Sequence, residues 1–280
     1  MKKICCLVTL YNPELENIKQ YMHYIENFDI VLFFDNSSEK SVLYEELIKY
    51  KNVVYVWDGN NYGYAHSINY AFDFALRNEM DYLLTMDQDT VFEEGEIQKS
   101  ITYVNAFDKN DIGIIATNFN KMYHNKGKIV YSKCYYHKNT SEAVFAITSG
   151  NYINVSNVKK IFPLENYFIA YVDYELNMQL YINNLKVYVM EDVVIHQQIG
   201  QKDVKFSFLS TLGFTNHAPI RYYYLGRNSL HFIKKYRMYK VAKKLYRRNM
   251  RNYFFKILLS EKNKIQKIKN FFKGRKDSNF

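Results

Sequence analysis

The chain has 280 residues, of which 48% are hydrophobic and 18% aromatic, enough to bury the core of one large domain and too many for a disordered chain. Its three cysteines, Cys5, Cys6 and Cys134, are odd in number and lack CxxC spacing, which argues against a disulfide framework or a zinc cage and fits a reducing compartment. No run of about 18 apolar residues occurs, so we expect no membrane-spanning helix. The short apolar run behind Lys2 and Lys3 predicts a buried strand and not a secretion signal.

The formal net charge of +10 is unevenly distributed along the chain. Residues 1–220 contain 19 Lys and Arg against 26 Asp and Glu, a net charge of −7, whereas residues 221–280 contain 19 against 2, a net charge of +17. The sequence therefore predicts a mildly acidic body with a very basic carboxy-terminal tail. Such a tail is typical of a segment that meets an anionic partner.

Apolar runs of strand length alternate with segments of helical periodicity in the first third of the chain. We expect strands at 4–10, 30–34, 53–57 and 82–86, and helices at 13–24, 41–50 and 67–77. Strands separated by helices of about ten residues predict a parallel sheet with helices on both faces. Ligands of such sheets bind outside the carboxyl ends of the strands.

Polar residues follow each of these strands where the strand is expected to end. They are Thr9-Leu10-Tyr11-Asn12, Asp35-Asn36-Ser37-Ser38, Asn60-Asn61 and Asp87-Gln88-Asp89. Asp87 and Asp89 project to the same side of an extended segment, where two carboxylates repel each other unless a cation or a proton lies between them. They predict a site for a hard divalent cation, Mg²⁺ or Mn²⁺. The alternative is a polar turn in which Asp89 caps the next helix.

The ordered set of these segments resembles the amino-terminal half of the inverting family-2 glycosyltransferases, which have the GT-A fold. The resemblance covers residues 3–232. It implies that Thr9, Tyr11, Asn12, Asp35 and Asn36 bind the nucleotide. Asn61, Gly63 and Asn69 stand in a segment similar to the family's N-x-G-x-(A/G)-x-x-x-N signature, and Asp87-Gln88-Asp89 matches its Asp-x-Asp, which holds the metal and the nucleotide sugar.

The second half supplies residues that the resemblance places around the sugar and the acceptor. Ser149-Gly150-Asn151 is similar to the family's small-residue turn near the donor sugar, and Asp173 and Glu175 fall on its catalytic pair, with Asp173 as the base. Gln179 stands where the family has an Arg, so that ion pair is absent. The alternative for Asp173 and Glu175 is that they only favour a helix amino terminus. His196 is expected near the metal, or else as a structural histidine.

The stretch Arg221-Tyr222-Tyr223-Tyr224-Leu225-Gly226-Arg227-Asn228 is similar to a Tyr-rich Arg-Asn segment of the rhamnosyltransferase-like branch. Arg221 or Arg227 would neutralise the departing diphosphate, or would be plain surface arginines. The resemblance thus implies a metal-dependent inverting transferase of bacterial surface-polysaccharide assembly. Its first-choice donor is dTDP-rhamnose, with a UDP-hexose as the alternative.

We therefore expect an α/β protein of GT-A type, Rossmann-like, with a mostly parallel central sheet flanked by helices and a basic helical C-terminal extension. Residues 1–232 would form the catalytic domain and residues 233–280 the tail. The tail interleaves Lys and Arg with Phe, Tyr, Ile and Leu at near-helical spacing, which indicates a basic amphipathic helix on an anionic membrane. Packing on the catalytic domain or on a second subunit, as in a homodimer, is the alternative.

The resemblance also implies a lipid-linked or oligosaccharide acceptor and a cytoplasmic enzyme, peripheral at the inner face of the cell membrane. Two functions of other classes are the alternatives. A nucleotidyltransferase needs a Gly-rich phosphate loop, and residues 7–13 contain no glycine. A nucleic-acid-binding protein is suggested only by the tail, whose basic and aromatic residues also suit phosphates and bases.

Overall fold

The computed structural model describes residues 1–125, 128–134, 142–143, 145–198, 217–259 and 262–278. These residues form two compact units, each described by itself below. The first comprises Met1–Asn120, Lys133–Asn166 and Val172–Gln197, and the second Lys121–Ser132, Tyr167–Tyr171 and Gln198–Phe280. The boundary expected after residue 232 falls inside a helix of the second unit that continues to Tyr236.

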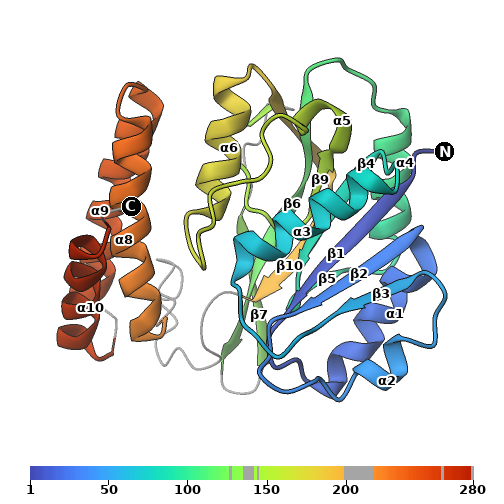
Figure 1. The fold of residues 1–280 in the computed structure, drawn as a ribbon, viewed down its shortest axis with the longest axis horizontal. Helices are drawn as coiled ribbons and strands as arrows, with labels where there is room; N and C mark the ends of the chain where they lie inside the picture. Colours follow the sequence, from blue (N-terminus) through green and yellow to red (C-terminus); the bar gives the residue numbers. More distant parts are fainter. Residues whose placement is uncertain (126–127, 135–141, 144, 199–216, 260–261, 279–280) are drawn as a thin grey trace. The chain divides into compact units, whose positions relative to one another are not determined.

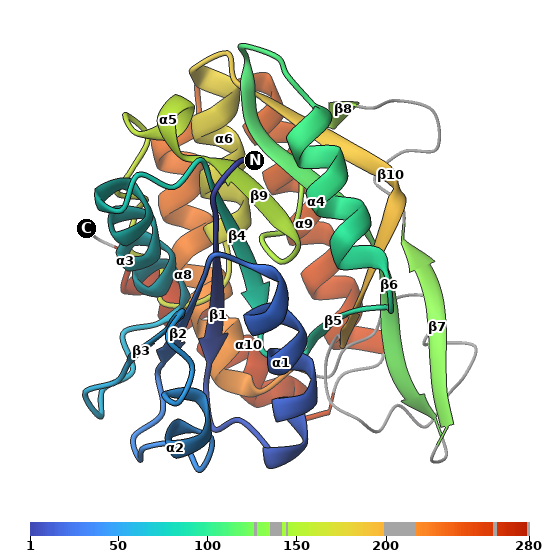
Figure 2. The same cartoon turned by 90° about the vertical axis from the view of Figure 1, so that its right-hand side faces the viewer.

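A ten-stranded sheet has the order β3-β2-β1-β4-β9-β6-β10-β5, with β7 paired to β6 and β8 to β10 (Figures 1 and 2). The strands are β1 (Ile4–Leu10), β2 (Ile30–Asp35), β3 (Val53–Val56), β4 (Tyr82–Asp87), β5 (Thr90–Phe92), β6 (Ile112–Asn125), β7 (Lys128–Cys134), β8 (Glu142–Ala143), β9 (Asn151–Asn154) and β10 (Lys186–Gln198). The helices up to β10 are η1 (Leu15–Asn17), α1 (Ile18–Asn27), α2 (Tyr44–Leu47), α3 (Tyr64–Arg77), α4 (Glu96–Ala106), α5 (Val155–Val158) and α6 (Val172–Ile182).

The expected parallel sheet is confirmed for strands β3, β2, β1 and β4. Beyond β4 the sheet becomes antiparallel: β9 pairs antiparallel with β4 and β6, and β10 pairs antiparallel with β5 and β8. Four central positions of β1, from Cys5 to Val8, are completely buried, which explains its unbroken apolar run: a strand covered on both faces has no polar side.

Alternating side chains of β2 show how the helices cover the sheet. The ring of Phe33 contacts Tyr21 of α1 at 5.3 Å between centroids, whereas Phe34 contacts Tyr70 of α3 at 5.3 Å. Successive strand residues point to opposite faces, so α1 and α3 lie on opposite faces of the sheet, as Figures 1 and 2 show.

Two helices start later than their sequence patterns predict. The expected helix at 13–24 begins as the short η1 and continues as α1, because the backbone of Asn12 is left-handed, with φ of 46°. The expected helix at 41–50 is reduced to the four residues of α2. Both delays leave polar backbone beside the ends of β1 and β2.

The described residues of the second unit contain three helices, α8 (Pro219–Tyr236), α9 (Lys240–Leu259) and α10 (Lys264–Lys276). Helix α10 crosses α8 at two glycines: a Cβ at Gly226 would lie 2.0 Å from the carbonyl oxygen of Phe271, and one at Gly274 would lie 1.9 Å from that of Tyr223. Among the described helices none is long and apolar enough to cross a membrane.

Candidate active site

The carboxyl ends of three parallel strands meet at one edge of the sheet. Thr9 of β1 is paired with Asp87 of β4, and the next residue, Leu10, with Asp35 of β2. The register therefore brings three predicted site residues, Thr9, Asp35 and Asp87, to neighbouring positions where ligands of parallel sheets bind.

The Asp35 carboxylate is buried and held by three donors. Oδ1 accepts hydrogen bonds from the backbone N–H of Ser37 at 2.9 Å and from its hydroxyl at 2.5 Å, and Oδ2 accepts one from the Tyr55 hydroxyl at 2.5 Å. Burial, and then the hydrogen bond and charge of Asp35, raise the pKa of Tyr55, so its hydroxyl remains a donor. Asp35 is thus a fixed acceptor at the end of β2.

A hollow of about 240 Å³ opens beside Asp35. Its lining includes five rings and two carboxylates: Phe34, Trp57, Tyr62, His66, Tyr70, Asp35 and Asp58. The rings of Tyr62 and His66 are stacked at 4.7 Å, and the Trp57 indole N–H donates to the Ser37 carbonyl at 3.0 Å. Flat rings beside a fixed acceptor suit a planar heterocycle with an N–H group, such as a pyrimidine.

The loop after β1 is tied to the Asp-Gln-Asp turn. The Tyr11 N–H donates to Gln88 Oε1 at 2.7 Å, and Gln88 Nε2 donates back to the Tyr11 carbonyl at 3.1 Å. The Asn12 N–H donates to the Ser37 hydroxyl at 2.7 Å. Tyr11 and Asn12, both predicted to bind nucleotide, are exposed at the strand ends with their backbones fixed.

The other predicted nucleotide-binding amides bond to the protein itself. Asn36 accepts from the Tyr62 N–H at 3.0 Å and donates to the Ser67 hydroxyl at 3.0 Å, so it ties β2 to α3. The Asn61 side chain accepts from the N–H of Gly63, whose φ of 84° starts α3. Asn69 exchanges two hydrogen bonds with the backbone of Leu164. In this structure these asparagines shape the signature segment, and their contact with a ligand stays a prediction.

Asp87 and Asp89 flank the turn between β4 and β5, and both are partly buried. The Asp87 N–H donates to the Ser149 hydroxyl at 3.0 Å, and that hydroxyl donates to Thr90 at 2.8 Å. Ser149, predicted to contact the sugar, is buried and supports the turn from behind. Asp89 caps no helix, because β5 follows it and the next helix, α4, begins after Gly95.

Gly150, the other small residue of the predicted sugar-side turn, is required by close packing. Its φ is 79°, and a Cβ there would lie 2.3 Å from Thr117 Oγ1 and 2.5 Å from Ile195 Cδ1. Only glycine fits this backbone and this space.

The expectation for His196 needs a correction. Its Nε2 contacts Glu93 Oε1 at 2.5 Å, whereas the Nε2 of its neighbour Gln197 donates to Asp87 Oδ2 at 2.7 Å. Because successive residues of β10 point to opposite faces, Gln197 shares the side of Ile195 and Gly150, and His196 points away to Glu93. His196 therefore does not join Asp87 and Asp89 in this structure.

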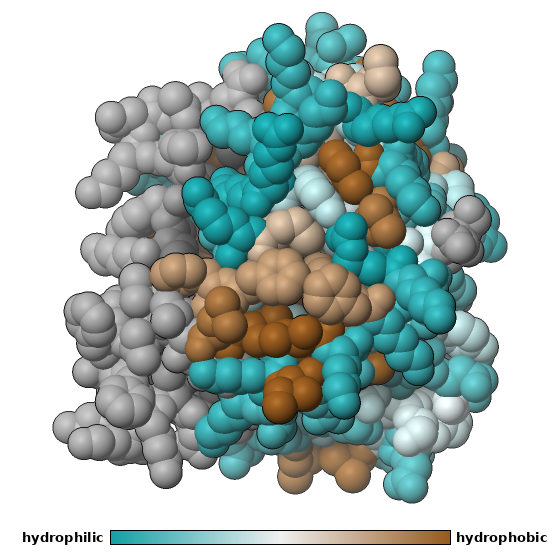
Figure 3. Space-filling view, turned by 90° about the vertical axis from the view of Figure 1, so that its left-hand side faces the viewer, coloured by the Kyte–Doolittle hydropathy of each residue, from teal (hydrophilic) through white to brown (hydrophobic). Residues whose placement is uncertain are grey.

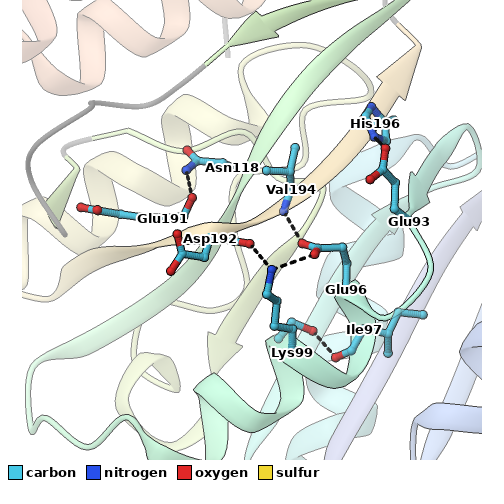
Figure 4. A network of polar contacts seen from close by, with 10 residues as sticks. Glu93, Glu96, Ile97, Lys99, Asn118, Glu191, Asp192, Val194 and His196 are labelled. Atoms are coloured by element: carbon cyan, nitrogen blue, oxygen red, sulfur yellow. Dashed lines mark hydrogen bonds and ion pairs between the residues drawn. The ribbon is translucent and has the colours of Figure 1, made fainter.

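The His196–Glu93 contact belongs to a network of polar contacts, here called the clasp, between β10 and the start of α4 (Figure 4). Glu96 accepts hydrogen bonds from the Val194 N–H at 2.9 Å and from Lys99 Nζ at 3.0 Å. Lys99 Nζ also donates to the Asp192 carbonyl at 2.9 Å. This clasp is structural, and it sets the face of β10 from which Gln197 reaches Asp87.

Asp173 opens α6, as predicted, and is anchored by Thr148. Its Oδ1 accepts a hydrogen bond from the Thr148 N–H at 3.0 Å and another from the Thr148 hydroxyl. Glu175, two residues later, is buried with 1% of its surface exposed, and Gln179 donates to it at 3.3 Å. Of the two predicted catalytic residues only Asp173 is partly exposed.

Tyr64, which the sequence did not single out, lies near both predicted carboxylates. Burial, followed by the negative charges of Asp87 and then Asp173, raises the pKa of Tyr64 well above its ordinary value. Two successive residues hold the two sides of the site: the Ser149 hydroxyl accepts from the Asp87 N–H at 3.0 Å, and the Thr148 N–H donates to Asp173 Oδ1 at 3.0 Å. The strand-end turn and the start of α6 are therefore both anchored on residues 148–149.

The residues that the sequence missed are Tyr64, Thr148 and Gln197. Tyr64 falls in the predicted signature segment, so its place at the start of α3 was a usable signal. Thr148 and Gln197 each adjoin a predicted residue, and only the pairing of distant segments reveals their partners. Arg221 and Arg227 lie on α8 in the second unit, where the Arg227 Nε donates to Asn228 Oδ1 at 3.1 Å.

The donor set at the Asp87–Asp89 turn fits a hard divalent cation. Two carboxylates from one turn, with a carboxamide beside them, are oxygen ligands of the kind that Mg²⁺ and Mn²⁺ take. No group of three or more His, Cys, Asp and Glu side chains that could hold a metal occurs in the part of the chain that the structure describes. A cation at Asp87 and Asp89 would therefore complete its shell with oxygens of a bound phosphate or with water.

A comparison with known families decides the class. The sequence model described as Glycosyl transferase family 2 matches residues 11–162, more than half of the chain. The chain belongs to this family. It is a glycosyltransferase, and the matched residues contain the strand ends, the signature segment and the Asp-Gln-Asp turn.

Known proteins resemble this glycosyltransferase in sequence and in fold. It is 23% identical over 246 residues to dTDP-rhamnosyl transferase RfbF of Shigella flexneri, across 83% of this chain and 80% of that protein. A solved structure of S. aureus TarS superposes with a TM-score of 0.56 at 13% identity, covering 82% of this chain and 40% of that one. TarS 1–349 in complex with UDP-GlcNAc has a TM-score of 0.55 at 12% identity, covering 96% of this chain and 70% of that one. The transferase thus has the fold of TarS and spans less than half of the longer TarS chain.

Proposed function

We propose that this glycosyltransferase moves rhamnose from dTDP-rhamnose to an acceptor hydroxyl with inversion at the anomeric carbon. The observation that carries the proposal is that two successive residues, Thr148 and Ser149, hold the Asp173 carboxylate and the Asp87 backbone, each through a hydrogen bond of 3.0 Å. This arrangement sets a carboxylate suited to the donor diphosphate beside one suited to an acceptor hydroxyl.

The pyrimidine ring of the nucleotide-sugar donor would occupy the hollow beside Asp35. Asp35 would accept the imide N–H that thymine and uracil share, and the rings of Tyr62 and Trp57 would cover the base. The preference for dTDP-rhamnose rests on the likeness to RfbF, and the UDP-GlcNAc complex of TarS supports a UDP-hexose as the alternative donor.

Asp87 and Asp89 would hold Mg²⁺ or Mn²⁺ against the diphosphate. When bound, the cation supplies positive charge against the charge that develops on the leaving group. The protein contributes the fixed geometry: Ser149 supports the turn through the Asp87 N–H, and Gln197 holds the Asp87 carboxylate.

Asp173 would act as the general base. The acceptor hydroxyl gives its proton to the Asp173 carboxylate while its oxygen bonds to the anomeric carbon. The bond from that carbon to the diphosphate breaks on the opposite face, so that the nucleoside diphosphate leaves. Thr148 fixes Oδ1 of the base in place. No covalent intermediate with the protein is needed.

Asp173→Asn tests the base, with Glu175→Gln as the matched variant. The Asn side chain keeps the size of Asp and cannot accept the proton, so transfer should fall by about 10²–10⁴-fold with little change in donor affinity. Rates of transfer and a titration of donor binding measure both effects. Near-wild-type transfer by Asp173→Asn would remove the base assignment, and loss of donor binding would place Asp173 on the donor side.

We also propose that the tail helices attach the enzyme to an anionic membrane that carries a lipid-linked acceptor. Figure 3, a view onto these helices, shows apolar side chains gathered among hydrophilic ones. Exposed apolar side chains of α9 and α10 are Phe255, Leu258, Ile265 and Phe272, with exposures of 58%, 62%, 72% and 54%. Residues 221–280 carry a net charge of +17, and an apolar face with basic residues around it suits an anionic lipid surface.

Point variants test this attachment without removing helices that pack on one another. Leu258→Ser with Ile265→Ser should weaken sedimentation with vesicles containing phosphatidylglycerol by about tenfold. Val42→Ser with Leu76→Ser, exposed apolar positions of the first unit, should leave it unchanged. Raised salt should weaken the binding of all forms. Equal binding by both double variants contradicts membrane attachment through this face, and preferential binding to RNA would favour a nucleic-acid partner.

A further inference from the structure

Residues 167–171, the strap, lead directly into the helix that carries Asp173. The strap belongs to the second unit, and α6 begins at the next residue, Val172. Its last two residues, Ala170 and Tyr171, have left-handed backbones with φ of 64° and 69°. Such a conformation is unfavourable for a non-glycine residue and persists only where surrounding contacts impose it.

One face of α8 supplies those contacts. Side chains at spacings of three and four residues along α8 meet the strap, and they are Tyr224, Asn228, His231 and Phe232. Tyr224 stacks on Phe168 at 4.9 Å, His231 meets Tyr167 at 5.6 Å, and Phe232 meets Tyr171 at 5.4 Å.

Asn228 makes the polar contact in this row. It is completely buried, and its Nδ2 donates to the carbonyls of Ile169 at 2.9 Å and Ala170 at 3.1 Å. Its Oδ1 accepts from the Arg227 Nε, and the Arg227 guanidinium lies over the Tyr224 ring at 5.1 Å. Both donors of one buried amide are thus used on two successive carbonyls at the point where the chain turns left-handed.

We propose that Asn228 is a positioning residue for the base: it imposes the left-handed turn at Ala170 and Tyr171, and thereby sets the start of α6 and the Asp173 carboxylate two residues later. This inference rests on the proposed role of Asp173. It also assigns Asn228, at the end of the Tyr-rich segment, to the acceptor side of the reaction, whereas the diphosphate contact was predicted for Arg221 or Arg227 of the same segment.

The test is a double-mutant cycle of Asn228→Ala and Asp173→Asn, with Ser229→Ala as the matched control. Ser229 is equally buried on the same helix, but its hydroxyl bonds to the Gly226 carbonyl of that helix at 3.0 Å and, among the described residues, to no part of the strap. In the wild-type background Asn228→Ala should lower kcat for transfer by about 10–10²-fold and leave the donor KM within about twofold. In the Asp173→Asn background it should have no further effect, because its action passes through Asp173.

The outcomes separate this inference from the proposed function. Additive losses in the double variant, or a raised donor KM with unchanged kcat, overturn the role of Asn228 and leave the base assignment standing. Near-wild-type transfer by Asp173→Asn alone overturns the base assignment, and the inference falls with it. If Asn228→Ala does not fold, Asn228→Asp replaces it, because it keeps the size and the acceptor for Arg227 while losing both donors to the strap.

Discussion

Asp173 and Glu175 lie two residues apart on the first turn of α6 and have different surroundings. Glu175 is buried with a carboxamide donor, whereas Asp173 is partly exposed and held by Thr148. A group that takes a proton from a substrate must be able to reach that substrate. The exposure of Asp173, set by its position on the helix, therefore makes it the better candidate for the base than the buried Glu175.

Asp89 provides the test of the metal. Asp89→Ala removes one of two carboxylates from the turn, so we expect metal-dependent turnover to fall by about 10²-fold or more and Mn²⁺ binding, followed by electron paramagnetic resonance, to weaken. Asp73→Ala, which removes an exposed carboxylate of α3 paired with Arg77, is the control. Removal of metal by a chelator should abolish turnover of the wild type. Unchanged Mn²⁺ binding by Asp89→Ala would exclude this turn as the metal site.

Gly150 and Gly95 allow a matched comparison of how much stability the protein loses when a glycine is replaced by alanine. Both have φ of 79°, but a Cβ at Gly95 meets nothing within 4 Å, whereas one at Gly150 would overlap Thr117 and Ile195. Gly95→Ala should cost only the left-handed strain, about 1–2 kcal/mol. Gly150→Ala should lower the free energy of unfolding by a further 1–3 kcal/mol or so, measured by urea unfolding. Equal losses would mean that the turn moves easily to accept a methyl group.

At the scale of elements, the crossing of α8 and α10 depends on glycines. Replacing an exposed glycine inside a helix with alanine normally stabilises the protein by about 1 kcal/mol. Gly226→Ala should have the opposite sign, because its methyl group would strike the Phe271 carbonyl. We expect roughly 1–3 kcal/mol of destabilisation in thermal or urea unfolding, against no more than about 0.5 kcal/mol for exposed Lys234→Ala on the same helix. A stabilised Gly226→Ala variant would show that the two helices separate readily.

At the scale of the whole molecule, labelling of Cys5 and Cys6 can measure the unfolding of the first unit. Both are completely buried on β1, and burial raises the pKa of the Cys5 thiol to about 12. The Cys5 thiol therefore stays protonated at pH 8, and labelling by a thiol reagent should follow unfolding of this unit in a Cys134→Ser background. A nucleotide at about 100 times its Kd adds about 2.7 kcal/mol of stability, so dTDP with Mn²⁺ should raise the temperature of labelling by roughly 5 °C. The same labelling temperature with and without nucleotide would argue against a base site beside β1 and β2.

The sequence by itself determined the parallel half of the sheet and the strand ends that carry Asp35 and Asp87. These features follow from local patterns: unbroken apolar runs, helical spacing, and polar residues where a run stops. The helix start at Asp173 followed from the resemblance to the family, and the structure has α6 there. The tertiary structure alone decided that Gln197 and not His196 faces Asp87, that Thr148 and Ser149 anchor both Asp173 and Asp87, and that Asn228 holds the strap. Each of these depends on which face a strand presents and which distant segment packs there, and such pairings arise only when the chain closes on itself.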